Sequence, residues 1–359
     1  TNRWRDEFVV TEKNACRWRG IALVMVLIIG CVGLLAACGD RPPTSAAGGP
    51  DDAAGAGERR EKLRIMLDWY PNAVHAFLYV AQEKGYFAEE GVDVEIHMPA
   101  ETNDPLRLVA ANQVDLALSY QPQLVMAKAE GLPNVAVAAV VRHPLNALMV
   151  KADHPVRSPK DLEGRTLGYP SIPTNEAILK TMVTSDGGDP EQVQLQDIGW
   201  EIMQALSTDR VDAVLGGYIN HEKLLLEKHG VPVRVIDPVA YGVPDYYELI
   251  LVTSQDTLAE KREAIAAFWR AAQRGQADVV ADPEGALDVL FRQQNDAFPL
   301  EEDIERQSLD VLLPLMDAGE KPFGYREASA WEQVVDWLHR EGVIDRELDA
   351  EELFVNLAE

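Results

Sequence analysis

Aromatic and polar side chains follow three predicted strands, at the point where each strand ends. Residues 68–72 (Asp-Trp-Tyr-Pro-Asn) follow the first strand, and Tyr120 and Tyr218 follow two later ones. Aromatic rings can stack on a planar ligand, and carboxylate or amide groups can bind its polar edge. The residue types therefore indicate noncovalent binding of a small ring compound.

Catalytic and metal-binding patterns are absent from the sequence. The three cysteines lie at positions 16, 31 and 38, so the rest of the chain offers no disulfide, zinc thiolate or cysteine nucleophile. The seven histidines include no His-Glu-x-x-His pattern, and the Gly-x-Ser-x-Gly, Walker and Gly-x-Gly-x-x-Gly motifs are missing. We expect no catalytic residue, no metal and no cofactor.

Strands and helices alternate along the chain from residue 63. The first set of predicted elements comprises strands at 63–67, 92–96 and 115–118, with helices at 74–81 and 104–112 between them. A second set comprises strands at 165–168, 193–196, 211–215, 233–236 and 247–253, with a helix starting near Pro173. Helices follow from about residue 256. This order predicts an α/β fold with mostly parallel sheets.

One sequence pattern occurs once in each set. Val-Asp begins both 114–120 and 211–218, and each stretch continues through a short apolar strand to a tyrosine. Ligands of open α/β sheets bind beyond the carboxyl ends of the strands. The repeated pattern predicts two lobes that face a shared cleft.

Charge restricts the class of partner. The 359 residues include 33 Lys and Arg against 59 Asp and Glu, for a formal net charge of -26. Nucleic acid binding requires clustered basic residues, so we exclude it. The five segments expected to form the cleft, namely 68–72, 119–123, 169–176, 216–221 and 241–248, contain no Lys or Arg but contain Asp68, Glu176, Asp245 and Glu248. This inventory favours an uncharged ligand, although backbone amides at a helix start are an alternative anion site.

The first sixty residues have the pattern of an export and anchoring signal. An uncharged apolar run at 21–37 follows Lys13, Arg17 and Arg19, and it ends in Leu-Ala-Ala before Cys38. This pattern resembles the bacterial lipobox, so we expect residues 1–38 to be a lipoprotein signal peptide with Cys38 as the acylated residue. The alternative is an uncleaved transmembrane helix. Residues 39–60 contain no large apolar side chain and are expected to be a flexible tether. These features predict a protein held on the outer face of the cell membrane by a lipid anchor.

Several stretches of the chain match a known family. They are 67–72, His75, 83–94, 119–123, 143–146, 168–173, 216–218 and 241–249. In these stretches the chain resembles bacterial solute-binding proteins that serve ABC transporters for pyrimidine precursors of thiamine. The resemblance implies the periplasmic-binding-protein type II fold, with residues 61–148 and 250–359 in one lobe and 149–249 in the other. It implies capture of hydroxymethylpyrimidine or formylaminopyrimidine by hinge closure and delivery to an ABC permease. A riboflavin-like compound or a sulfonate is the alternative cargo.

The position of residues at strand ends and this resemblance together give the candidate ligand-binding residues. They are Asp68, Trp69, Tyr70, Asn72, His75, Tyr120, Gln121, Asn146, Tyr169, Glu176, Tyr218, Tyr247 and Glu248. Structural roles are open for several of them. His75 would otherwise cap or pack, the strand-end tyrosines would brace loops, and Glu176 would complement a helix dipole. Tyr246 and Tyr247 would point to opposite faces of a strand, so at most one faces the ligand.

An enzyme is the remaining alternative. The resemblance extends to hydroxymethylpyrimidine phosphate synthases, which use pyridoxal phosphate through a lysine and consume a histidine of their own. The matching positions here are Ser119 and Gln123, and the loop at 241–248 has no cysteine. A Schiff base requires an amine, which Ser119 lacks. We therefore expect a binding protein and not an enzyme.

Overall fold

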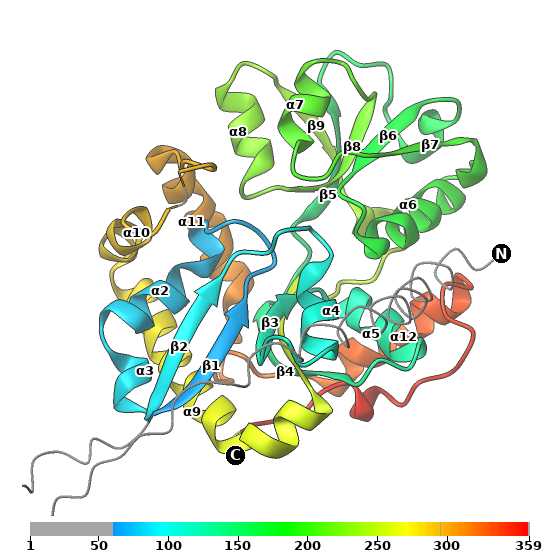
Figure 1. The fold of residues 1–359 in the computed structure, drawn as a ribbon. Coiled ribbons are helices and arrows are strands. Elements are labelled where there is room, and N and C mark those ends of the chain that lie inside the picture. The colour runs from blue at the N-terminus through cyan, green and yellow to red at the C-terminus, as the bar shows by residue number, and fades with distance from the viewer. Residues whose placement is uncertain (1–59, 295, 358–359) are drawn as a thin grey trace, which may run out of the picture. The chain divides into compact units, whose positions relative to one another are not determined.

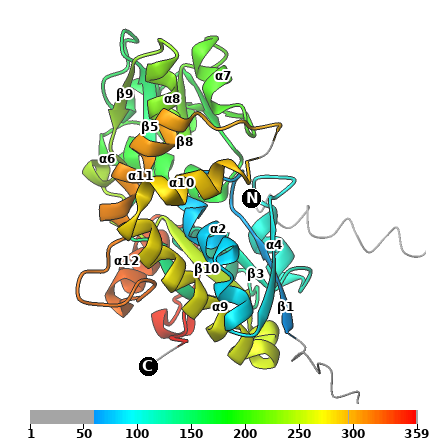
Figure 2. The same cartoon turned by 90° about the vertical axis from the view of Figure 1, so that its left-hand side faces the viewer.

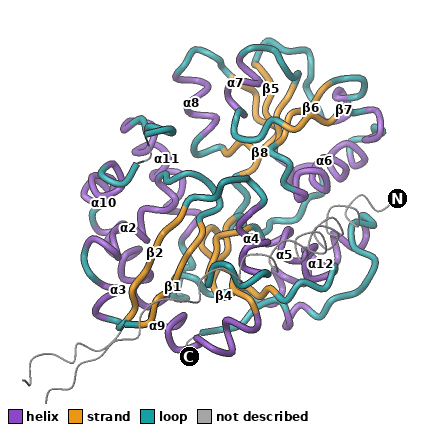
Figure 3. Tube along the Cα trace, in the orientation of Figure 1, coloured by secondary structure: helices purple, strands orange, loops and turns teal. Residues whose placement is uncertain are grey.

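The computed structural model describes residues 60–294 and 296–357, which form two five-stranded sheets with helices on both sides of each (Figures 1 and 3). Within these residues, no helix is long and apolar enough to cross a membrane. The predicted signal peptide, the acylated Cys38 and nearly all of the 39–60 tether lie outside the described residues.

The first sheet contains β1 (Glu61–Met66), β2 (Val92–His97), β3 (Leu116–Ser119), β4 (Asn134–Val141) and β10 (Leu249–Ser254). Their order is β2-β1-β3-β10-β4. β1 pairs in parallel with β2 and β3, whereas β10 is antiparallel to both β3 and β4. Four of the five strands therefore run in one direction, and only β10 is reversed.

The second sheet repeats this arrangement. It contains β5 (Asn146–Lys151), β6 (Thr166–Tyr169), β7 (Gln194–Asp197), β8 (Ala213–Tyr218) and β9 (Val233–Ile236), in the order β7-β6-β8-β5-β9. β5 is antiparallel to β8 and β9, whereas β6 is parallel to β7 and β8. In both sheets the reversed strand is the first one after the chain crosses from the other lobe. The α/β expectation is confirmed, but the reversed strands make both sheets mixed.

Helices cover both faces of the first sheet. The 3₁₀ turn η1 (Ala73–His75) and helices α2 (Ala76–Glu83), α3 (Tyr86–Glu89), α9 (Gln255–Ala281) and α10 (Pro283–Phe291) pack together on one side (Figure 2). Helices α4 (Asp104–Ala110), α5 (Gln121–Ala129) and α12 (Ala328–Arg340) lie on the other side, and α11 (Glu302–Met316) packs against η1 and α10. Trp269, Trp331 and Trp337 are buried in these layers.

The second sheet is covered by α6 (Pro173–Ser185) on one face and by α7 (Ile202–Ser207) and α8 (Glu222–Lys228) on the other. Short 3₁₀ turns η2 (Pro159–Leu162), η3 (Pro190–Gln192), η4 (Pro238–Tyr241) and η5 (Ala350–Glu352) complete the elements. Pro173 occupies the first turn of α6, where its missing N–H has no intrahelical partner to lose.

The chain crosses between the lobes twice. It leaves the first sheet after β4 ends at Val141, and it returns when β10 begins at Leu249. The boundary expected between residues 148 and 149 falls inside β5, which belongs wholly to the second sheet. The two connecting segments, 142–145 and 242–248, run beside the cavity described next.

Candidate functional site

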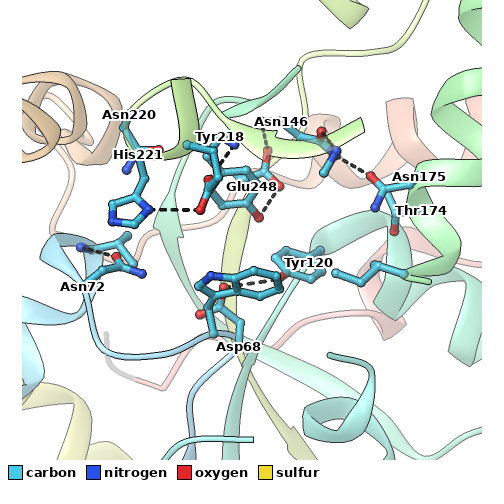
Figure 4. Close-up of a pocket in the computed structure, with 15 residues that line it drawn as sticks. Asp68, Asn72, Tyr120, Asn146, Thr174, Asn175, Tyr218, Asn220, His221 and Glu248 are labelled. Carbon is cyan, nitrogen blue, oxygen red and sulfur yellow. Dashed lines mark hydrogen bonds and ion pairs between the residues drawn. The ribbon is translucent and has the colours of Figure 1, made fainter. Parts of the chain in front are cut away.

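A cavity lies between the two sheets and is lined by residues from both lobes (Figure 4). The cavity and the solvent-filled space at its mouth together amount to about 570 Å³. Its lining residues are Asp68, Trp69, Asn72, Val74, Tyr120, Asn146, Ile172, Thr174, Asn175, Gly216, Tyr218, Asn220, His221, Glu222 and Glu248.

Asp68 is the carboxylate that the first lobe contributes. It follows β1, is 3% exposed, and is held by His75, whose Nε2 lies 2.9 Å from Asp68 Oδ1. The backbone N–H of Asn72 donates to Nδ1 of His75 at 3.2 Å, so the imidazole carries its proton on Nε2 and donates it to Asp68. The hydroxyl of Tyr120 donates to Asp68 Oδ2 at 3.2 Å. Each carboxylate oxygen thus retains acceptor capacity toward the cavity.

Glu248 joins both connecting segments. Its Oε2 accepts the backbone N–H groups of Leu145 and Asn146 at 2.7 and 2.9 Å and the Tyr246 hydroxyl at 3.3 Å. Its Oε1 accepts the hydroxyl of Tyr218 at 3.0 Å. Burial raises the pKa of Glu248, and these four donors act in the opposite direction. The carboxylate is therefore largely engaged by the protein at the point where the lobes meet.

His221 is a buried cation that links the lobes. It precedes α8, and its Nδ1 and Nε2 lie 3.0 Å from Glu222 Oε1 and 3.0 Å from Glu305 Oε1. Burial disfavours the charged imidazole, but Glu222 and Glu305 outweigh burial and raise the pKa of His221 to about 10. Glu305 belongs to α11 of the first lobe, and its Oε2 accepts the backbone N–H of Ala73 at 2.8 Å. This ion pair holds α8 against the loop that carries Asp68.

Gly216 lets the backbone of β8 pass close to Pro170, in the segment that precedes α6. Its φ angle is 106°, in the left-handed region, and a Cβ at this position would lie 2.6 Å from Cδ of Pro170. The backbone N–H of Gly216 donates to Asn146 Oδ1 at 2.9 Å, and Asn146 Nδ2 donates to Asn175 Oδ1 at 2.6 Å. A side chain at position 216 would therefore clash with Pro170 and crowd Asn175 Nδ2, which would lie 3.0 Å from its Cβ.

Aromatic side chains meet across the lobes beside the cavity. The rings of Trp69 and Trp200, from opposite lobes, have centroids 4.2 Å apart. Tyr70 stacks on Phe298 with centroids 4.7 Å apart, and Phe298 lies 6.0 Å from Trp200. The cluster holds Trp69 at the cavity wall, where its ring is placed to stack on a ligand.

Seven of the candidate residues line the cavity: Asp68, Trp69, Asn72, Tyr120, Asn146, Tyr218 and Glu248. The tyrosines at the ends of β3 and β8 therefore do meet, as the repeated Val-Asp pattern predicted. The structure brings these seven residues together from five separate parts of the chain.

The other six candidates lie outside the cavity lining. His75 is wholly buried behind Asp68, and Tyr70 packs on Phe298. Gln121 is also buried, because its Oε1 accepts the backbone N–H of Tyr247 at 2.7 Å and its Nε2 donates to the carbonyl of Ala330 at 3.2 Å. These three side chains support the fold around the site.

Tyr169, Glu176 and Tyr247 point elsewhere. The Tyr169 hydroxyl donates to Glu176 Oε1 at 2.6 Å, and Glu176 is exposed on α6. Tyr247 packs near Trp331, and its hydroxyl accepts the backbone N–H of Glu327 at 3.0 Å. The neighbouring Tyr246 is buried, and its hydroxyl donates to Glu248 Oε2 at 3.3 Å. Neither tyrosine lines the cavity.

Eight lining residues were not among the candidates: Val74, Ile172, Thr174, Asn175, Gly216, Asn220, His221 and Glu222. All but Val74 and Glu222 lie within the segments expected to form the cleft. Six of the eight share a position: Ile172, Thr174 and Asn175 lie at or just before the start of α6, and Asn220, His221 and Glu222 lie at or just before the start of α8. Residue type alone did not distinguish them from ordinary loop and helix-start residues.

The lining has an acidic character. It contains Asp68, Glu222 and Glu248 with His221 as the single basic side chain, and neither lysine nor arginine lines it. Within the described part of the chain, no group of three or more His, Cys, Asp or Glu side chains could hold a metal ion. Such a cavity is suited to an uncharged ligand that carries hydrogen-bond donors.

Comparison with known proteins gives the family. The family model described as NMT1/THI5 like matches residues 72–286. The chain is 48% identical over 303 residues to the formylaminopyrimidine-binding protein of Halalkalibacterium halodurans, an alignment that covers 84% of this chain and 92% of that protein. It is also 35% identical over 303 residues to a protein of Haemophilus influenzae that is named for thiamine biosynthesis. That alignment covers 83% of this chain and 93% of the other protein.

The fold is shared with a solved binding protein. The alkanesulfonate-binding protein SsuA from Xanthomonas axonopodis pv. citri aligns with a TM-score of 0.66 at 11% identity, covering 83% of this chain and 99% of that chain. At this identity the likeness establishes the two-lobed architecture of the periplasmic binding proteins and nothing about the ligand. The chain belongs to the NMT1/THI5-like family.

Proposed function

We propose that the protein is the solute-binding component of an ABC importer and that it captures a pyrimidine precursor of thiamine. The observation that carries the proposal is the cavity between the lobes, lined by aromatic rings and three carboxylates without lysine or arginine. The similarity to a formylaminopyrimidine-binding protein supports this cargo over a riboflavin-like compound or a sulfonate.

Recognition of the ring follows from two kinds of contact. Trp69 and the strand-end tyrosines offer faces on which the pyrimidine stacks. Asp68 accepts hydrogen bonds from the exocyclic amino group, because His75 and Tyr120 each donate to a different one of its oxygens and leave acceptor capacity on both. A sulfonate or phosphate ester would meet three carboxylates instead, and its entry would cost free energy.

Binding without covalent chemistry is the second part of the proposal. The residue that matches the cofactor lysine of the synthases is Ser119, which is 2% exposed and donates to Gln123 Oε1 at 3.2 Å. Neither side chain lines the cavity, and the cavity wall presents no primary amine. These residues do not fit pyridoxal phosphate chemistry at this position.

Anchoring to the outer face of the cell membrane is also proposed. It is supported by the apolar run at 21–37 and the lipobox pattern that ends at Cys38. Two acyl chains on Cys38 would hold the protein beside the permease that receives its cargo. Replacement Cys38→Ser should abolish acylation and remove the protein from the membrane fraction. Normal acylation of this variant would exclude Cys38 as the acceptor.

Calorimetry with the purified full chain tests the ligand. We expect binding of formylaminopyrimidine and hydroxymethylpyrimidine, with weak or undetectable binding of the phosphate ester and of an alkanesulfonate. Mass spectrometry of small molecules that copurify with the protein provides an independent check. Tighter binding of the phosphate ester or the sulfonate than of either uncharged pyrimidine would refute the proposal.

A further inference from the structure

One end of the cavity is formed by Asn146 and the start of α6, as Figure 4 shows. The Gly216 N–H donates to Asn146 Oδ1, which fixes the orientation of that side-chain amide. Asn146 Nδ2 therefore donates to Asn175 Oδ1. Since the oxygen of Asn175 is occupied by this bond, its other amide group, Nδ2, is presented as a donor. A backbone amide thus determines which way a cavity-lining side chain points.

Asn220, at the other end of the cavity, lacks such a constraint. Its Nδ2 lies 2.9 Å from the hydroxyl of Ser308. A hydroxyl both donates and accepts, so this contact is satisfied with either orientation of the amide. The orientation of the Asn175 amide is fixed by the fold, whereas the contact with Ser308 allows either orientation of the Asn220 amide, whose Oδ1 has no partner among the described residues.

Thr174 adds a second polar group beside Asn175. It is 3% exposed, lines the cavity, and its Oγ1 has no hydrogen-bond partner among the described residues. Leaving a buried hydroxyl without a partner is unfavourable. Thr174 is also the second residue of the 13-residue helix α6, where the first backbone N–H groups lack intrahelical acceptors. The two neighbouring side chains therefore offer hydrogen bonds at one wall of the cavity.

Acceptors predominate among the other polar groups of the cavity. Asp68, Glu222 and Glu248 are acceptors, and both N–H groups of His221 are engaged by Glu222 and Glu305. The buried Nε1 of Trp69 is the exception, a donor without a partner among the described residues. A ligand that carries donors toward the carboxylates and an acceptor oxygen at the α6 end would satisfy both of these groups.

We propose that Thr174 Oγ1 and Asn175 Nδ2 form a subsite for an uncharged carbonyl oxygen of the ligand. This inference rests on the proposed function and specifies it: the formylamino form of the pyrimidine binds more tightly than the same pyrimidine with a free amine. A protonated amine has donors only, and it would face the Asn175 donor without an acceptor. The acyl oxygen accepts from both groups.

Two variants test this subsite by calorimetry with three ligands: formylaminopyrimidine, its free amine, and the pyrimidine in which hydrogen replaces the formylamino substituent. Thr174→Val should weaken formylaminopyrimidine binding by roughly 3- to 12-fold, the loss of one neutral hydrogen bond, and leave the truncated pyrimidine within about 2-fold. Asn175→Asp keeps the acceptor for Asn146 but replaces the donor by a carboxylate oxygen. It should shift the preference toward the free amine by at least about 10-fold. Thr184→Val, at an exposed position of the same helix, is the matched control and should bind all ligands as the native protein does.

The outcomes separate the two proposals. If the native protein binds none of the three pyrimidines, the proposed function fails. If it binds them but Thr174→Val weakens the truncated ligand as much as formylaminopyrimidine, the subsite is refuted. An Asn175→Asp variant that keeps the native preference also refutes it. The phosphate ester is included as a fourth ligand. If it bound more tightly than the other three and lost that binding in Thr174→Val, the carbonyl subsite would be refuted in favour of an anion site.

Discussion

The buried pair of His221 and Glu305 should make stability depend on pH in a predictable direction. The imidazole has an ordinary pKa of about 6.5 when unfolded, and its pKa in the folded protein is raised to about 10. The folded state therefore holds a proton that the unfolded state releases. The resulting stabilisation is fully present below pH 6.5 and is lost as the pH rises through about 10.

The size of the effect follows from one bound proton. Between the two pKa values the free energy of unfolding falls by at most about 1.4 kcal/mol per pH unit. From pH 7.5 to 9.5 the native protein should therefore lose up to about 3 kcal/mol through this group. Glu305→Gln removes one of the two carboxylates, so the pKa of His221 falls and the pH dependence in this window becomes shallower. Breaking the buried pair should also cost about 3–5 kcal/mol at neutral pH.

Urea unfolding at pH 6.5, 7.5, 8.5 and 9.5 measures both effects. Asp303→Asn is the control, because Asp303 lies on the same helix but forms an exposed ion pair with Lys228. Its pH profile should follow that of the native protein. If the free energy of unfolding fell equally steeply with pH in the native protein and in Glu305→Gln, the assignment of a high pKa to His221 would be refuted.

Three further predictions concern the cavity. Asp68→Asn should weaken binding of the uncharged pyrimidine by about 1.5–3 kcal/mol in calorimetry, whereas the exposed Glu176→Gln should leave it nearly unchanged; equal effects would show that Asp68 does not bind the amino group. Gly216→Ala places a Cβ 2.6 Å from Pro170 at a φ of 106°, so it should lower the free energy of unfolding by about 2 kcal/mol, and an unchanged urea midpoint would contradict this. Trp200→Phe removes the indole that contacts Trp69 across the lobes; the tryptophan fluorescence change on ligand binding should shrink, and a native-sized change would indicate that this contact does not respond to closure.

Alternation and turn residues located most of the strands. The runs at 63–67 and 92–96 became β1 and β2 within two residues, because one face of each strand is buried and the other is exposed. β4 and β5 were not predicted, and the burial of β4 shows why: all eight of its residues are buried. A continuous apolar run carries no periodicity that separates a strand from a buried helix. These two strands became evident only when the sheets assembled.

The expectation that ligands bind beyond the carboxyl ends of the strands located part of the site. Tyr120 and Tyr218 reach the cavity because the carboxyl ends of parallel strands share one edge of a sheet, which is a property of the backbone. Tyr169 also lies at the end of a strand, but it does not line the cavity, because its side chain is directed to Glu176. The end of a strand determines where a residue lies, whereas packing determines where its side chain points.

The sequence by itself determined the class of fold, the acidic cavity segments without lysine or arginine, and the exclusion of cysteine chemistry, because these depend on composition and local period. Tertiary structure alone decided that Tyr246 and not Tyr247 faces Glu248, and that His221 meets Glu305 from a helix 84 residues away in the chain. Local patterns indicate that neighbouring side chains point in different directions, but the surfaces that pack against them determine which one contacts Glu248. The buried cation exists because two lobes bring their carboxylates to the same imidazole, and no segment read alone contains that contact.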